Sequence, residues 1–185
     1  MRYLKLLLII AIVFTLFTSC TRYRYGDQTF TDRSKAETAY KEDIAKMSAA
    51  IQPRKTPLAK YAKVIIPDKN ILLERAVIGG TSESRDYLAT YFLDQTQAIG
   101  EMIRKRNIFE KVDINYTSDP GHVTPKSNEV LIYFYIPDRK TGGWYYISDK
   151  TKRTPVHFDR GNPDLVEKNK FFIDSIEALA AGESM

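Results

Sequence analysis

The sequence has a single cysteine and only two histidines in 185 residues. One cysteine cannot form an intramolecular disulfide, so the fold must be stabilised by packing alone. His122 lies in a loop rich in proline and glycine and His157 on an expected strand, without the spacing of a zinc-binding pair. The sequence also lacks a Gly-x-Ser-x-Gly nucleophile elbow, a phosphate-binding loop and a calcium loop. We therefore expect no enzymatic activity, no metal site and no cofactor.

Positive and negative charges nearly balance each other, with 28 basic and 23 acidic residues and a net charge of +5. So small an excess does not by itself argue for nucleic acid, and we expect no nucleic-acid partner. The basic run from Arg104 to Arg106 lies where an expected helix ends, and cations there offset the negative end of the helix dipole. Binding to phosphates of lipopolysaccharide or nucleic acid is the alternative, but the position at a helix end favours the first interpretation.

The long hydrophobic run of this sequence lies close to its start. Leu6 to Phe17 is apolar except for Thr15, and the positive charges of Arg2 and Lys5 precede it. A charged start, an apolar core of this length and small residues after it are typical of a secretory signal. The run is too short to span a membrane comfortably: even counted to Thr21 it reaches roughly 24 Å, against a hydrocarbon core of about 30 Å.

The sole cysteine comes directly after this segment. Phe17-Thr18-Ser19-Cys20 resembles the lipobox of bacterial lipoproteins, in which an aliphatic residue and two small residues precede the cysteine. Phe17 stands where that family usually has leucine. The resemblance implies that residues 1–19 are a signal peptide that is removed. It also implies that Cys20 carries diacylglycerol on its thiol and an acyl chain, such as palmitate, on its amine. Two or three such chains anchor a protein stably to a membrane.

This interpretation predicts a lipid-anchored protein of the outer membrane that faces the periplasm. Thr21 follows the cysteine, in place of the aspartate that retains many lipoproteins at the inner membrane. The inner membrane and the cell surface stay open as alternatives. So do an ordinary signal peptide and an uncleaved anchor with an incidental cysteine. Arg22 and Arg24 favour these two, because positive charges at that position resist export.

Residues 20–57 are predicted to form a tether followed by an amphipathic helix. Residues 20–32 show no clear period and indicate the tether. Ser34 and Glu37 match a capping box, and apolar residues then recur at helical spacing up to Pro53. The predicted helix covers 34–51. Its narrow apolar stripe consists of Ala36, Tyr40, Ile44, Met47 and Ile51.

Residues 58–185 are predicted to form a single α+β domain. We expect strands over 61–67, 71–78, 112–116, 129–136, 144–148 and 153–158, and helices over 82–106 and from Asn162 onwards. The first helix should bury Leu88, Phe92, Gln95, Ile99, Met102 and Ile103. The second should bury Leu165, Phe172, Ile173, Ile176 and Leu179. This order predicts a mostly antiparallel sheet of about four or five strands with both helices packed on one face.

The globular part also resembles several α+β domains of the bacterial cell envelope. They are the lipopolysaccharide-transport lipoprotein, the N-terminal domain of the Tol system's periplasmic propeller protein and the curli-secretion lipoprotein. The shared pattern is a strand, a helix that ends in a basic turn, Ile108-Phe109-Glu110-Lys111-Val112, and then strands with a Trp-led hairpin and a closing helix. It covers about 60–180 and is a pattern of elements without a diagnostic motif. The resemblance implies an envelope domain of the same class.

Aromatic residues after a glycine pair suggest a surface for a partner. Gly142 and Gly143 precede Trp144, and strand alternation places Trp144 and Tyr146 on one face with Tyr145 on the other. Aromatic residues are enriched in protein interfaces, so we expect Trp144 or Tyr146 to contact a partner. Packing beneath the two helices explains the same residues equally well.

Two functions from different classes follow. The first is a non-enzymatic, lipid-anchored envelope module that binds a protein partner or a glycolipid in assembly or transport. The alternative is an envelope hydrolase whose site is built from scattered acidic residues, of which Asp113, Asp119, Asp138 and Asp149 are candidates. Aspartates in turns usually serve turn formation. The missing nucleophile, metal ligands and phosphate loop favour the first function.

Overall fold

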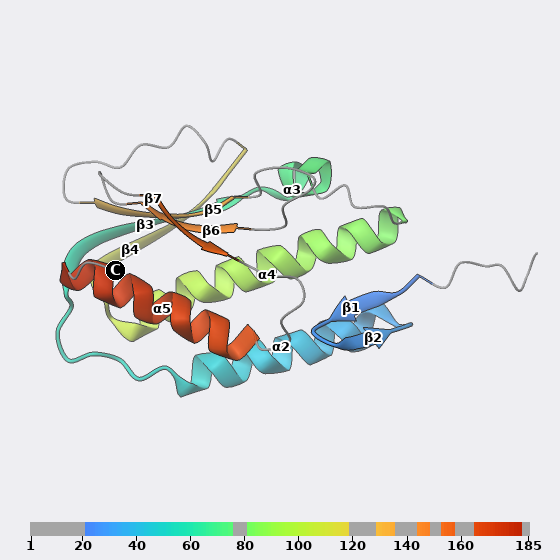
Figure 1. Cartoon of the computed structure of the whole chain (residues 1–185), viewed down its shortest axis with the longest axis horizontal. Coiled ribbons are helices and arrows are strands. Elements are labelled where there is room, and N and C mark those ends of the chain that lie inside the picture. The colour runs from blue at the N-terminus through green and yellow to red at the C-terminus, as the bar shows by residue number, and fades with distance from the viewer. Residues whose placement is uncertain are drawn as a thin grey trace, which may run out of the picture.

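The computed structural model describes residues 21–75, 81–118, 129–135, 144–148, 153–157 and 165–182 (Figure 1). Within them the chain is a mixture of helices and strands, and the predicted α+β class is confirmed. The elements are β1 (Tyr23–Tyr25), β2 (Gln28–Phe30), α2 (Arg33–Ala50), β3 (Ala59–Pro67), α3 (Lys69–Arg75), α4 (Ser82–Arg106), β4 (Phe109–Thr117), β5 (Glu129–Tyr135), β6 (Trp144–Ser148), β7 (Arg153–His157) and α5 (Leu165–Ala181). In the described part, no helix is both long enough and apolar enough to cross a bilayer.

The main sheet has the strand order β4-β3-β5-β6-β7. The central strand β3 pairs in parallel with both β4 and β5, whereas β5, β6 and β7 pair antiparallel. The prediction of a mostly antiparallel sheet is therefore wrong for the β4-β3-β5 half. The cause is the connection between β3 and β4, where α3 and α4 carry the chain back so that the second strand starts from the same edge.

The second predicted strand, over 71–78, is also wrong. Its described part belongs to the helix α3, and residues 76–78 lie outside the described residues. The side chain of Asp68 accepts a hydrogen bond from the backbone N–H of Ile71 at 3.0 Å, which satisfies a donor at the start of this helix. Leu72 is buried against the rest of the fold. A short apolar run does not distinguish a buried strand from a buried helix. Here the Asp68 cap favours the helix.

Helix α4 has the predicted bounds, and its ends explain them. The Thr81 side chain accepts a hydrogen bond from the Ser84 N–H at the start, and Asn107 adopts a left-handed conformation with φ 59° at the end. Leu88, which we expected in the core, is 37% exposed, because its neighbours Tyr87 and Ala89 face inwards instead. That expectation is wrong.

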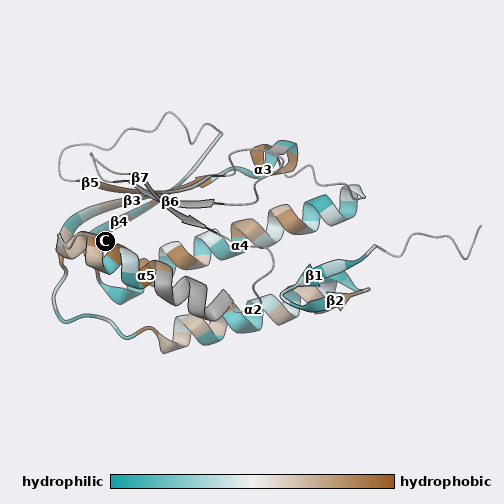
Figure 2. Ribbon diagram, viewed as in Figure 1, coloured by the Kyte–Doolittle hydropathy of each residue, from teal (hydrophilic) through white to brown (hydrophobic). Residues whose placement is uncertain are grey.

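The main core lies between the sheet and the helices α4 and α5, which are on the same side of the sheet (Figure 1). Alternation along β3 points Ala62, Val64 and Ile66 into this core. Of the face predicted for the last helix, Phe172, Ile173 and Ile176 are buried and Leu179 is partly buried. Hydrophobic residues accordingly form patches on the helices between hydrophilic ones (Figure 2).

Gly100 allows α4 to approach the sheet closely. A Cβ atom at this position would lie 2.9 Å from Cδ1 of Ile114 on β4 and 3.6 Å from Cγ1 of Val64 on β3. Real Cβ atoms do not come so close to another carbon, so a larger residue would push Ile114 aside. The glycine therefore sets the spacing between helix and sheet.

The N-terminal segment is packed onto the fold. The expected tether is wrong for residues 23–30, where β1 and β2 pair as an antiparallel hairpin. Gly26 and Asp27 form its two-residue turn, with Gly26 at φ 55°, and Tyr23 is only 3% exposed.

Helix α2 follows this hairpin and matches the predicted amphipathic helix. Of its stripe, Ala36, Tyr40 and Met47 are buried, and Ile44 and Ile51 are partly buried. The predicted capping box is wrong, since the Asp32 side chain accepts from the Ser34 N–H and Glu37 instead binds Arg33. Met47 belongs to the main core, so α2 shares its packing with the elements that follow it.

Candidate functional site

The predicted lipidation site, Cys20, lies outside the described residues. Only Thr21 and Arg22 separate it from the first strand, β1. Any group attached to Cys20 is therefore close in sequence to the β1–β2 hairpin. Lipidation itself stays a prediction.

The predicted partner-binding residues, Trp144 and Tyr146, lie on β6. This strand is between β5 and β7, with Trp144 opposite Tyr135 and His157. β6 is thus an interior strand with both backbone edges paired. The side chains of β6 lie outside the described part of the structure, so their role in partner contact stays a prediction.

Sequence reasoning missed a group of five tyrosines that joins the hairpin to α2 and α4. We call it the tyrosine cluster; its members are Tyr23, Tyr25, Tyr40, Tyr87 and Tyr91. The ring centroids of Tyr40 and Tyr91 are 4.9 Å apart and those of Tyr23 and Tyr87 are 5.2 Å apart, both edge to face. Such pairs contribute about 0.5–1.5 kcal/mol each beyond the area they bury. The cluster therefore holds the hairpin in a fixed position.

Two tyrosine hydroxyls of this cluster donate hydrogen bonds to aspartate side chains. Tyr40 donates to Oδ2 of Asp94 and Tyr25 donates to Oδ2 of Asp43, each at 2.7 Å. Burial, followed by the hydrogen bond to Asp94, raises the pKa of Tyr40 well above its usual range. Burial likewise raises the pKa of Tyr87 to about 12. These phenols stay protonated at neutral pH and serve packing and hydrogen bonding, not proton transfer.

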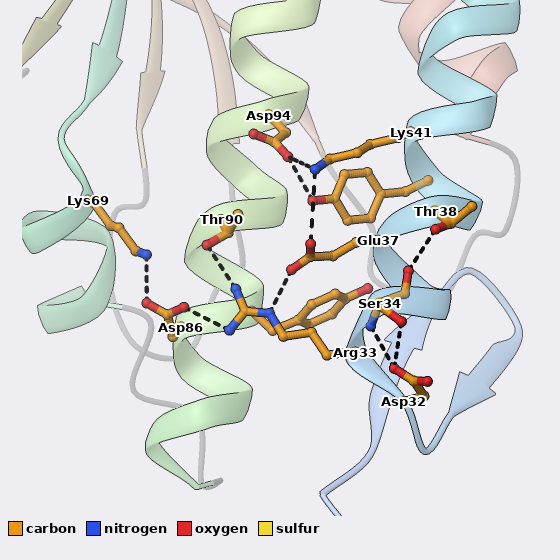
Figure 3. A network of polar contacts seen from close by, with 12 residues as sticks. Asp32, Arg33, Ser34, Glu37, Thr38, Lys41, Lys69, Asp86, Thr90 and Asp94 are labelled. Atoms are coloured by element: carbon orange, nitrogen blue, oxygen red, sulfur yellow. Dashed lines mark hydrogen bonds and ion pairs between the residues drawn. The ribbon is translucent and has the colours of Figure 1, made fainter.

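A row of ion pairs beside the cluster connects α2, α3 and α4 (Figure 3). Asp86 accepts from Arg33 at 2.9 Å and lies 2.6 Å from Nζ of Lys69. Arg33 also donates to Glu37 at 2.6 Å and to Thr90 at 3.4 Å. The contact with Lys69, and then that with Arg33, lowers the pKa of Asp86 below its ordinary value. This carboxylate is held ionised by two cations.

A cavity of about 560 Å³ opens next to these ion pairs. The residues that line it are Arg33, Leu73, Ser82, Glu83, Arg85 and Asp86. Its polar groups come from the starts of α2 and α4. Arg33 and Asp86 already bind each other, so neither is free to act as an acid or base.

A second cavity, of about 380 Å³, lies at the opposite end of α4. Glu177 of α5 receives hydrogen bonds there from Arg106, at 2.9 Å, and from Arg54. The two guanidinium groups, Arg106 first, lower the pKa of Glu177. This cluster fixes the end of α5 to the segment after α2, and we call it the Glu177 clamp.

The basic run at the end of α4 makes contacts within the protein. Arg104 donates to the carbonyl of Val112 at 3.0 Å, Lys105 to that of Ser48, and Arg106 to that of Gln52 at 2.7 Å. These contacts, together with the position in the last turn of α4, favour the structural interpretation of the run over phosphate binding.

Of the four acidic residues considered for hydrolysis, only Asp113 lies in the described part, so a site shared among them stays a prediction. Asp113 accepts from the Tyr61 hydroxyl and lies 3.3 Å from Nζ of Lys111, and the Tyr61 contact lowers its pKa. Asp119, Asp138 and Asp149 lie outside the described residues. Among the described residues there is also no group of three or more His, Cys, Asp or Glu side chains placed to hold a metal ion.

No protein-family model matches the chain, and neither a curated protein nor a solved structure is significantly similar to it. The resemblance to envelope domains drawn from the order of elements therefore stays a prediction.

Proposed function

We propose that this chain is a lipid-anchored protein of the cell envelope that acts as a non-enzymatic binding or assembly module for a protein partner or a glycolipid. The observation that carries the proposal is the apolar run from Leu6 to Phe17, followed at once by Thr18, Ser19 and the sole cysteine, Cys20. This order is typical of an export signal that ends at a lipidation site.

The chemistry of the described cavities supports a binding module over a hydrolase. An acid–base catalyst needs a side chain whose pKa lies near the working pH. Asp86 and Glu177 are instead held ionised by paired cations, with their pKa values lowered. Both carboxylates thus serve to hold elements of the fold together.

The proposal places the protein at the outer membrane, facing the periplasm, with lipid on Cys20 as its attachment. Thr21 after the cysteine supports export beyond the inner membrane. The partner is an envelope protein, contacted through Trp144 or Tyr146, or a glycolipid of the same membrane.

Labelled palmitate tests the anchor. Cells that make the wild-type chain should incorporate label into it, and Cys20→Ala should remain unlabelled as an unprocessed or soluble precursor. Thr21→Ala is the matched control, because it changes the neighbouring residue and keeps the thiol. Wild-type protein without label would overturn the proposal. Recovery of labelled protein with the inner membrane would overturn only its location.

A further inference from the structure

The distance between the proposed lipid attachment and the folded body is short. Cys20 is three residues before Tyr23, so their Cα atoms are at most about 11 Å apart even in a fully extended chain. Tyr23 is 3% exposed and therefore belongs to the packed part of the protein. A lipid on Cys20 thus attaches next to the body, not at the end of a long linker.

The hairpin that contains Tyr23 is fixed to two helices. The ring of Tyr23 packs edge to face on Tyr87 of α4 at 5.2 Å, and the Tyr25 hydroxyl binds Asp43 of α2 at 2.7 Å. The hydroxyl of Tyr87 also donates to the carbonyl of Arg24 at 3.4 Å. With contacts to both helices, the hairpin cannot swing away from them without breaking the tyrosine cluster.

The outer face of the hairpin is polar and carries positive charge next to the attachment point. Alternation along β1 places Arg24 on the face opposite Tyr23 and Tyr25, and Arg22 directly precedes the strand. Both arginines are exposed, as is Thr29, which is opposite Arg24 on β2. Arginine side chains beside a bilayer are attracted to anionic headgroups.

We propose that this outer face of the β1–β2 hairpin lies against the phospholipid bilayer that holds the acylated Cys20. The inference rests on the lipidation put forward in the proposed function. It adds that the protein docks on the membrane by one defined surface and is not suspended from it.

The same docking would orient the rest of the molecule. Helices α2 and α4 run in parallel from the hairpin, as the contacts of Arg33 with Asp86, and of Lys105 with the Ser48 carbonyl, show. Both helices therefore begin at the end where the hairpin lies (Figure 1). The 25 residues of α4 extend over about 37 Å. The Glu177 clamp lies at the C-terminal end of α4, away from the hairpin.

Fluorescence quenching in vesicles tests the docking surface. Asp27 in the hairpin turn and Lys55 beside the Glu177 clamp are both exposed, so Asp27→Cys and Lys55→Cys should leave the fold intact. In the lipoprotein purified from membranes the acylated Cys20 has no free thiol, so each variant accepts one dye. The labelled proteins are placed in vesicles of phosphatidylcholine and phosphatidylglycerol that carry a quencher on the lipid headgroup.

We expect the dye at position 27 to be quenched several-fold more strongly than the dye at position 55. Equal quenching at the two positions, or stronger quenching at 55, overturns the docking. Palmitate content, measured on the same samples, separates the two proposals. Palmitate-labelled protein with no quenching at 27 overturns the docking alone, whereas protein without palmitate overturns the anchor and the docking together.

Discussion

Tyr40 lies at the centre of the tyrosine cluster, and its replacement tests whether that cluster holds the N-terminal segment in place. The side chain is fully buried, and its ring centroid lies 4.9 Å from that of Tyr91 and 6.2 Å from that of Tyr25. Tyr40→Ala removes both the ring and the hydroxyl, whereas Tyr40→Phe removes only the hydroxyl. The pair of variants therefore separates packing from hydrogen bonding.

The two variants should differ widely in the free energy of unfolding. Replacing a buried aromatic residue by alanine typically costs about 3–5 kcal/mol, and the lost edge-to-face contacts place Tyr40→Ala towards the upper end. Tyr40→Phe loses one hydrogen bond, worth about 1 kcal/mol net. Its partner Asp94 is 33% exposed and lies 3.7 Å from Nζ of Lys41, so water and that cation compensate for the missing donor.

Thermal unfolding followed by circular dichroism measures the difference. For a protein of this size 1 kcal/mol corresponds to about 2–4 °C in Tm, so we expect Tyr40→Ala to melt about 8–20 °C below wild type and Tyr40→Phe about 2–4 °C below. Tyr116→Ala is the matched control, because that tyrosine is 53% exposed and should change Tm little. Equal losses for the alanine and phenylalanine variants would refute the packing argument.

Two further predictions concern the Glu177 clamp and β6. Glu177→Gln should cost about 1–3 kcal/mol at neutral pH, because it weakens two charged hydrogen bonds to Arg54 and Arg106. Since these cations lower the Glu177 pKa, its contribution is present above its ordinary pKa of 4.5 and is lost as the pH falls below that. Denaturation at several pH values should therefore show the wild type and variant converging in acid. Trp144→Ala should weaken partner capture with an unchanged Tm; a Tm lowered by many degrees would place Trp144 in the core instead.

The features that the sequence predicted correctly depend on neighbours along the chain. Helix α4 combines a cap, an apolar period and a run of basic residues before Asn107, all within one segment. The buried face of α5 follows from the spacing of Phe172, Ile173 and Ile176 in the same way. These signals are local, so a single sequence contains them in full.

The pairing of the strands depends on segments that are far apart. β3 lies between β4 and β5, although β5 comes after β4 in the chain, and no residue of β3 indicates which strand will be its neighbour. A strand, helix and strand in succession do favour a parallel pair, and that rule was available for β3, α4 and β4. The predicted strand over 71–78 hides this order, because it places a strand between β3 and α4 where the structure has the helix α3.

The hairpin was missed because its strands have only three residues each. A two-stranded hairpin alone is at best marginally stable in water. Here the stability comes from α2 and from Tyr87 and Tyr91 of α4, which lie at least 57 positions beyond the end of the hairpin. Two local signals were nevertheless present. Tyrosine alternates with arginine over residues 22–25, and Gly26-Asp27 is a pair typical of a hairpin turn.

The hairpin also changes what anchoring would do for this protein. A flexible chain over residues 20–32 would let the body range over roughly 20 Å above the membrane. With Tyr23 buried, only Thr21 and Arg22 remain between the proposed anchor and the fold. The helix α4 then sets the distance from the hairpin to the Glu177 clamp at about 37 Å, since a helix rises about 1.5 Å per residue. A partner that meets this protein at a fixed height above the bilayer would bind without first restricting a loose linker, and so without the entropy that such ordering costs.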